Sequence, residues 1–202
     1  MFKDSFEEQL LVLTQAKDWK AVLELSESLP LDRKSKYLWT WPTGEALENL
    51  KSTLHQLGIQ KLLSIGCGTG LLEWIIAESI GVSVYGLEVD RSWWESSYSP
   101  TSYIKLNFIN EICMQPSFLQ ECCDTKKWDF ALVFCFFNNG EAFREYLRLY
   151  HGSVVIIVGP SPEVGIHTDP APLKADFCES GWKLLKYFNI SNDDIISFYT
   201  KS

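Results

Sequence analysis

The sequence of 202 residues lacks the residue spacings of metal centres and thiol redox sites. Its six cysteines include no Cys-x-x-Cys pair, and its three histidines do not stand in pairs beside them. Zinc sites and redox motifs depend on such spacings. We therefore expect no metal and mostly buried, reduced thiols.

A long apolar run is also absent. The first eight residues already include Asp4, Glu7 and Glu8, whereas a signal peptide needs an uninterrupted apolar region. No apolar run approaches the roughly 18 residues of a membrane span. The expectation is a cytoplasmic protein without a membrane partner.

Positive charge is in short supply, because 18 Lys and Arg residues face 26 Asp and Glu residues, a formal net charge of -8. Such a chain repels phosphate backbones unless a local basic patch intervenes. The densest basic cluster, Arg33 to Lys36, is short and is interpreted as a solvated linker. Nucleic acid is thus disfavoured as a partner, and neutral or cationic groups are favoured.

What the chain does contain is a large apolar fraction, 46% of its residues, with 22% charged, as in a globular protein with a sizeable core. The length indicates one domain over residues 1–202. Within it, residues 1–42 are expected to form a helical extension or lid of one or two amphipathic helices, and residues 43–202 the core. Pro30 ends the helical part, and Thr43 is the expected N-cap of a helix that stops at Gly58.

Beyond Gly58 the pattern alternates between strands and helices, which indicates an α/β fold with a doubly wound, mostly parallel sheet and helices on both faces. The last two strands are joined by a short polar turn and should form an antiparallel hairpin. The expected strands are 59–65, 82–89, 128–137, 153–158, 182–190 and 195–200, with helices over 71–79 and 141–150.

The most informative motif follows the strand 59–65. It reads Gly66-Cys67-Gly68-Thr69-Gly70 and leads directly into a helix, so that a ligand can approach bare backbone at a helix N-terminus. Eighteen residues after Gly70, the next strand ends in Glu88. A carboxylate near this interval binds ribose hydroxyls in dinucleotide folds. Together the two features predict a nucleotide site.

The glycine spacing separates two kinds of cofactor. A nicotinamide or flavin fingerprint is Gly-x-Gly-x-x-Gly, whereas this chain has Gly-x-Gly-x-Gly, with Leu71 in the place of the last glycine. This motif resembles that of class I S-adenosylmethionine-dependent methyltransferases. The resemblance, which extends loosely over residues 62–200, implies a seven-stranded sheet. It also implies S-adenosylmethionine as the cofactor, bound by Gly66, Cys67, Gly68, Thr69, Gly70, Glu88 and Val89.

One position departs from that family. Many of its members carry an acid two residues before the first glycine, and this chain has Ser64 there. The departure implies a weaker or indirect contact with the amino group of the cofactor's methionine part. The resemblance also implies a residue that contacts adenine after the third strand, and the candidates there are Asn107 and Asn110.

Two residues are candidates for catalysis. Asn138 follows the strand 128–137, where the family places its reaction site, although the Pro-Pro-Tyr that follows this position in amide and adenine methyltransferases is missing. His167 lies in the long loop 159–172, and Asp169 could orient it as a general base. The alternatives are that Asn138-Asn139-Gly140 is a polar turn capping the next helix, and that His167 is an exposed or structural histidine.

Two groups of aromatic residues have two interpretations each. Tyr37, Trp39 and Trp41 are either the wall of a substrate pocket or a means of fixing the N-terminal helices to the core. Trp93 and Trp94 lie either beside the adenosine or against the following helix.

The resulting prediction is a methyltransferase that acts on a small molecule or a protein side chain. Its alternatives are a methyltransferase-like scaffold without catalysis and a Rossmann-type oxidoreductase, which the glycine spacing and the hairpin disfavour.

Overall fold

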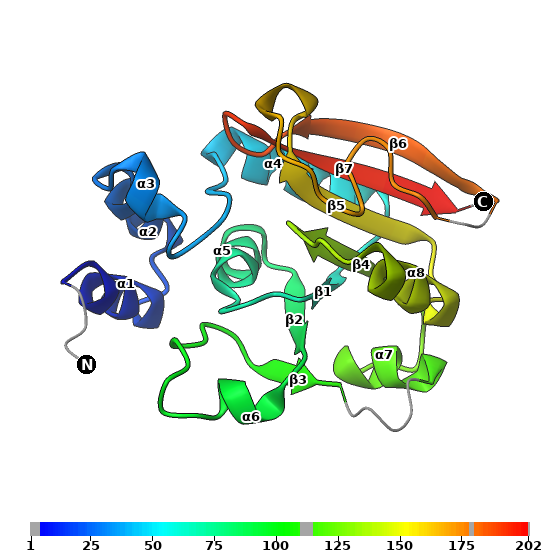
Figure 1. The fold of residues 1–202 in the computed structure, drawn as a ribbon, viewed down its shortest axis with the longest axis horizontal. Helices are drawn as coiled ribbons and strands as arrows, with labels where there is room; N and C mark the ends of the chain where they lie inside the picture. Colours follow the sequence, from blue (N-terminus) through cyan, green and yellow to red (C-terminus); the bar gives the residue numbers. More distant parts are fainter. Residues whose placement is uncertain (1–4, 110–114, 178–179, 202) are drawn as a thin grey trace.

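In the computed structural model, residues 5–109, 115–177 and 180–201 are described. Within them, seven strands form one sheet in the order β3-β2-β1-β4-β5-β7-β6 (Figure 1). Strands β1 to β5 pair in parallel, β7 runs antiparallel to β5, and β6 forms a hairpin with β7. The predicted fold, a mostly parallel sheet of seven strands with an antiparallel C-terminal hairpin, is confirmed.

The elements follow the expected alternation, and most bounds differ from the predicted ones by one or two residues. The strands are β1 Lys61–Ile65, β2 Ser83–Glu88, β3 Leu106–Phe108, β4 Phe130–Cys135, β5 Val154–Pro160, β6 Trp182–Asn189 and β7 Asp194–Lys201. The helices are α1 Ser5–Gln15, α2 Trp19–Glu27, α3 Leu31–Lys34, α4 Gly44–Gln56, α5 Leu71–Ile80, α6 Arg91–Trp94, α7 Pro116–Cys122 and α8 Gly140–Leu149, with a 3-10 turn η1 at Pro162–Val164.

The strand predicted over 128–137 is too long at its carboxyl end. β4 stops at Cys135 because Phe136 has a φ of 49°, in the left-handed region, where extended pairing cannot continue. The N-terminal segment also breaks, at Lys17 with a φ of 60°, and Asp18 then caps α2 by accepting a hydrogen bond from Ala21 N. Two amphipathic helices result.

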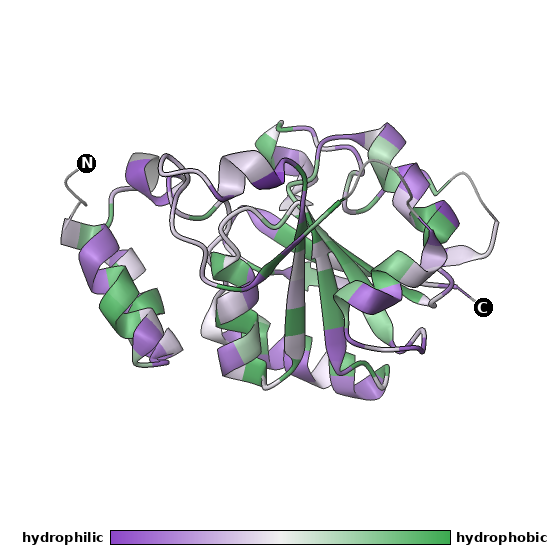
Figure 2. Cartoon of the chain, turned by 90° about the horizontal axis from the view of Figure 1, so that it is seen from below, coloured by the Kyte–Doolittle hydropathy of each residue, from purple (hydrophilic) through white to green (hydrophobic). Residues whose placement is uncertain are grey.

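Both faces of the central part of the sheet are buried, because side chains along β1, β4, β5 and β7 alternate between two apolar clusters, whereas β6 at the edge is mostly exposed. In β1, Leu62 belongs to the cluster that α1, α2, α4 and α5 cover, and Leu63 belongs to the cluster that α7 and α8 cover. In Figure 2 the strands are predominantly hydrophobic, while the helices mix both kinds of residue. The core therefore consists of two layers separated by the sheet.

The first helices contribute to one of these layers. Phe6 and Leu10 of α1 and Val22 of α2 are buried in the same cluster as α4 and α5. In Figure 1 the pair α1 and α2 lies beside α5, at one side of the sheet. No helix among the described residues is long and apolar enough to cross a membrane.

The carboxyl ends of the parallel strands meet at one edge of the sheet. The glycine motif follows β1, Glu88 ends β2, and the segment with Asn138 follows β4. Gly66 N donates a hydrogen bond to Leu87 O at 2.8 Å, which fixes the turn after β1 against the end of β2. This edge is where ligands bind in open α/β sheets.

Candidate functional site

The glycine turn between β1 and α5 adopts a backbone that few side chains tolerate. Gly66, Gly68 and Gly70 have φ values of 67°, 61° and 73°, all in the left-handed region. At Gly70 a side chain would also collide with Ile104, whereas nothing lies within 4 Å of the position that a Cβ would take at Gly68. The turn is thus tight on one side and open at Gly68.

Glu88 binds the middle of this turn. Its Oε1 accepts a hydrogen bond from Gly68 N at 2.6 Å, and its Oε2 accepts one from Val89 N at 3.2 Å. The Trp94 indole donates a further bond to the same carboxylate. Burial raises the pKa of Glu88, and these donors oppose that shift. The structure therefore brings the predicted glycines, Glu88 and Val89 together, with Trp94 at the acid.

A second carboxyl group lies beneath the turn, and the sequence analysis did not identify it. Glu73, in the first turn of α5, is 3% exposed, and its Oε1 accepts a hydrogen bond from Ser64 Oγ at 2.6 Å. Its Oε2 has no hydrogen-bond partner among the described residues. Burial raises the pKa of Glu73 to about 7. Glu73 thus places a carboxyl group beside Ser64. Ser64 stands at the position where many members of the family that the sequence resembles carry an acid.

One signal in the sequence could have identified Glu73. It is the only charged residue in the otherwise apolar run Leu71-Leu72-Glu73-Trp74-Ile75-Ile76. A charged side chain within a buried helical stretch is normally paired or functional.

Asn138 is part of a link between two loops. Its Oδ1 accepts a hydrogen bond from Asp169 N at 3.2 Å, and the two residues form an isolated β-bridge. The neighbouring Asn139 caps α8, because its Oδ1 accepts a bond from Ala142 N at 3.0 Å. The helix cap considered for this turn is present, and Asn139 provides it.

His167 is exposed, and no hydrogen bond joins it to Asp169 among the residues that the structure describes. The Asp169 side chain instead lies against Gly140 at the start of α8. The structure therefore brings Asp169 to Asn138 and does not orient His167 through it.

Of the two adenine candidates, only Asn107 is described, since Asn110 lies outside the described residues. Asn107 Nδ2 donates to Gly86 O at 3.2 Å and to Cys122 O at 3.4 Å. These bonds connect β3 to β2 and α7, so the Asn107 side chain has a structural role.

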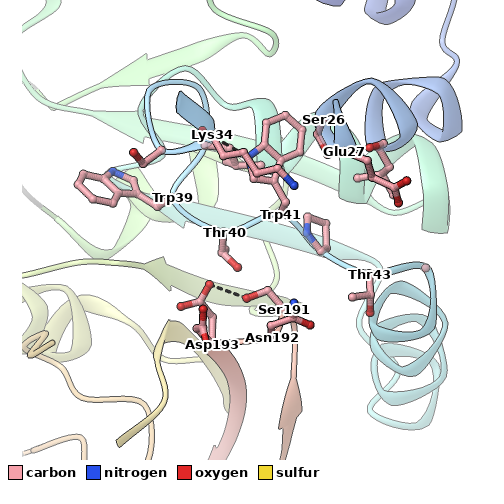
Figure 3. Close-up of a pocket in the computed structure, with 16 residues that line it drawn as sticks. Ser26, Glu27, Lys34, Trp39, Thr40, Trp41, Thr43, Ser191, Asn192 and Asp193 are labelled. Atoms are coloured by element: carbon pink, nitrogen blue, oxygen red, sulfur yellow. Dashed lines mark hydrogen bonds between the residues drawn. The ribbon is translucent and has the colours of Figure 1, made fainter. Parts of the chain in front are cut away.

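The three aromatic residues before α4 divide between the two interpretations. Tyr37 packs on Phe6, with ring centroids 4.5 Å apart, and so fixes α1 to the core. Trp39 is 70% exposed and stacks on Phe136 at 5.8 Å. Trp39 and Trp41 also line a cavity of about 530 Å³ between the N-terminal segment and the turn that joins β6 to β7 (Figure 3). Among the described residues, no cluster of His, Cys, Asp and Glu could hold a metal ion.

Comparisons with known proteins find similarity in structure only. No family model and no curated protein sequence matches this chain. Many similar solved structures are methyltransferases. An O-methyltransferase from Bacillus cereus in complex with SAH is 17% identical, with 100% of this chain and 93% of that chain covered and a TM-score of 0.48. Magnesium protoporphyrin IX methyltransferase from Synechocystis PCC 6803 with bound SAM is 14% identical, with 92% and 97% covered and a TM-score of 0.46.

Proposed function

We propose that this protein is an S-adenosylmethionine-dependent methyltransferase whose acceptor is a small molecule or a protein side chain. The observation that carries the proposal is the contact between Glu88 and Gly68 N at 2.6 Å, at the carboxyl edge of a parallel sheet. The contact places a carboxylate of the kind that binds ribose hydroxyls directly beside the open Gly-x-Gly-x-Gly turn.

The residues present fit this cofactor. Ribose hydroxyls are donors, and the Glu88 carboxylate can accept them beside the open space at Gly68. The cofactor also carries positive charge on its sulfonium and its amino group. Glu73 and Glu88 both act electrostatically on Cys67 within the turn, so two acidic side chains flank this segment. A positive charge close to the unpartnered oxygen of Glu73 would interact favourably with its carboxylate form.

The chemistry that S-adenosylmethionine supplies is an activated methyl group, which passes from its sulfonium sulfur to an acceptor nucleophile in an in-line displacement. The role of this chain's residues is then to position the acceptor and to exclude water. Asn138 lies after β4 at the same edge, which supports a contact with the acceptor. A base is needed only for a protonated acceptor, and His167 is the candidate that the sequence offers.

The alternative is a scaffold that retains the fold without catalysis. It is favoured by one observation, that Asn138 and Asp169 bond to each other while no hydrogen bond joins Asp169 to His167 among the described residues. The scaffold can occur with or without the cofactor, but it needs no ribose-binding acid, so the absence of cofactor binding would favour it.

The test is isothermal titration of the full chain with S-adenosylhomocysteine. Replacing Glu88 by alanine removes charge-assisted contacts and should weaken binding by about 1.5–3 kcal/mol, roughly 10- to 150-fold. The matched control is Glu95→Ala, which removes the same charge nearby from an exposed pair with Arg91 at 3.2 Å and should leave the affinity unchanged. No binding to the unmodified chain at millimolar ligand would favour the scaffold.

A further inference from the structure

The cavity of about 530 Å³ lies between two parts of the chain that are far apart in sequence. One wall is the end of α2 with residues 34–44, and the other is the turn at residues 191–194. Figure 3 shows Trp39 and Trp41 on one side, Ser191 to Asp193 on the other, and Thr40 between them. A cavity of this size accommodates a small organic molecule or a long side chain.

Thr40 provides an unsatisfied polar atom in this cavity. The residue is 1% exposed, and its Oγ1 has no hydrogen-bond partner among the described residues. In Figure 3 its side chain points toward the turn that carries Ser191. Buried hydroxyls normally have a partner. A ligand with an N–H or O–H donor would supply the missing partner.

The charge of the cavity is negative. Its lining includes the carboxylates of Glu27, Asp193 and Asp194 against the single ammonium of Lys34, among the residues that the structure describes. Asp194 is buried at 9% exposure, and Ser191 Oγ donates to its Oδ2 at 2.7 Å. A negative cavity attracts cations and repels anions.

The tryptophans complement these carboxylates. Trp39 is 70% exposed, so its ring face is open to a ligand. The face of an indole ring attracts a positive charge, and more strongly than the rings of Tyr or Phe. Trp41 is held by a bond from its Nε1 to Lys34 O at 3.4 Å. Carboxylates and indole rings together favour a positively charged nitrogen group.

The cavity adjoins the edge of the sheet that carries the glycine turn. Trp39 stacks on Phe136, the first residue after β4. The last residue of β4, Cys135, has a pKa raised by burial and then by the charges of Glu73, beneath the glycine turn, and of Asp194, in the cavity lining. Asp194 in turn pairs with Pro160 at the end of β5.

We propose that this cavity is the acceptor pocket and that it binds a positively charged nitrogen group of the acceptor, an ammonium or a guanidinium. The proposal rests on the proposed methyltransferase function. The unpaired Thr40 hydroxyl accepts an N–H of the ligand, Asp193 and Asp194 balance its charge, and the ring face of Trp39 attracts it.

The test uses three probes of similar size that differ in charge: phenethylamine, which is a cation at neutral pH, 2-phenylethanol and 3-phenylpropionate. Each is titrated into the full chain while the indole N–H resonance of Trp39 is followed by NMR. The cation should bind at least about tenfold more tightly than the alcohol, and the anion more weakly than the alcohol. Equal binding of the three probes, or no cation binding at 10 mM ligand, on the order of weak fragment affinity, would overturn the proposal.

Variants locate the binding. Asp193→Asn, at an exposed position, should weaken cation binding by about three- to tenfold and leave alcohol binding unchanged. Thr40→Val should weaken the binding of the cation by a similar factor. The NMR spectrum of this variant reports whether it is folded. The control Glu163→Gln removes an exposed carboxylate of η1 outside the cavity and should have no effect. Equal losses in Glu163→Gln and Asp193→Asn would contradict the assignment.

A last comparison separates this proposal from the proposed function. Phenethylamine binding is measured without and then with saturating S-adenosylhomocysteine. An acceptor pocket predicts that both bind at once. Mutual displacement would show that the cavity is the cofactor site, and would overturn the acceptor role. If the cation binds but S-adenosylhomocysteine does not, the transferase function fails and the acceptor role fails with it.

Discussion

At the scale of single residues, Glu73 is the most informative side chain. It is almost fully buried, accepts one hydrogen bond from Ser64, and keeps one oxygen without a partner among the described residues. A charge in such surroundings is costly, so the protonated form is favoured. The pKa of about 7 places its titration near neutral pH.

The first prediction concerns the pH dependence of stability. The pKa of Glu73 is 4.5 in the unfolded chain and about 7 in the folded one, so the folded state binds more protons between these values. The free energy of unfolding should therefore fall as the pH rises from 4.5 to 7, by about 3 kcal/mol. Urea unfolding of the ligand-free protein at pH 5 and pH 8 measures this difference.

Glu73→Gln is the matched variant. Glutamine keeps an oxygen for the bond from Ser64 and carries no charge, so its stability should change far less over the same pH range. Glu88 titrates in both proteins, and its charge is the smallest of the causes of the Glu73 shift, so most of its own contribution is common to the two proteins. The same loss of stability in both proteins would show that Glu73 is not the titrating group.

Part of this residue-level picture was accessible from the sequence. The motif and Glu88 were predicted together because the spacing between them is set by one strand, one helix and the next strand. Ser64 was recognised as a departure from the family. Glu73 places a carboxyl group beside Ser64 because of the way α5 packs on β1. A linear sequence pattern does not specify that packing.

At the scale of elements, two of the three glycines in the turn between β1 and α5 have different roles. Gly70 has its Cβ direction blocked by Ile104, while Gly68 faces open space. Both have positive φ, so alanine at either position carries backbone strain of roughly 1–2 kcal/mol.

The second prediction contrasts alanine at these two positions. Gly70→Ala should destabilise the fold by about 2–4 kcal/mol, because overpacking against Ile104 adds to the strain. Gly68→Ala should cost roughly 1–2 kcal/mol but weaken S-adenosylhomocysteine about tenfold or more, since the methyl group occupies space used by the ligand. Urea unfolding and calorimetric titration measure the two effects. Unchanged affinity in Gly68→Ala would exclude a ligand at this turn.

The elements themselves were largely predictable from hydrophobic periodicity. The buried parallel strands appeared as apolar runs, and the polar turn at residues 191–194 predicted the hairpin. The three residues of β3 and the four of α6 are too short to produce a period. The end of β4 was missed because Phe136, a typical strand residue, adopts a left-handed conformation.

At the scale of the whole molecule, the N-terminal helices and the C-terminal hairpin together create the cavity. The aromatic residues before α4 suggest one wall of a pocket, and nothing in the sequence of the hairpin indicates the other. The contact between these two parts of the chain exists only after the sheet has placed β7 beside β5. The sequence could therefore suggest Trp39 and Trp41 as a pocket wall, but not the carboxylates of Asp193 and Asp194 opposite them.

The molecule as a whole also has a consistent electrostatic character. A net charge of -8 agrees with an acidic acceptor pocket and with a cofactor that carries positive charge. The division of the chain into an extension at residues 1–42 and a core at residues 43–202 stays a prediction.

The measurement that tests the central claim most directly is an NMR titration of the ¹⁵N-labelled full chain with S-adenosylhomocysteine. The account predicts that the largest amide shifts occur at Gly66, Gly68, Gly70 and Val89. Gly68 N and Val89 N donate to the Glu88 carboxylate, and Gly66 and Gly70 lie on either side of the open position at Gly68. Shifts confined to other parts of the chain, or none at millimolar ligand, would contradict it.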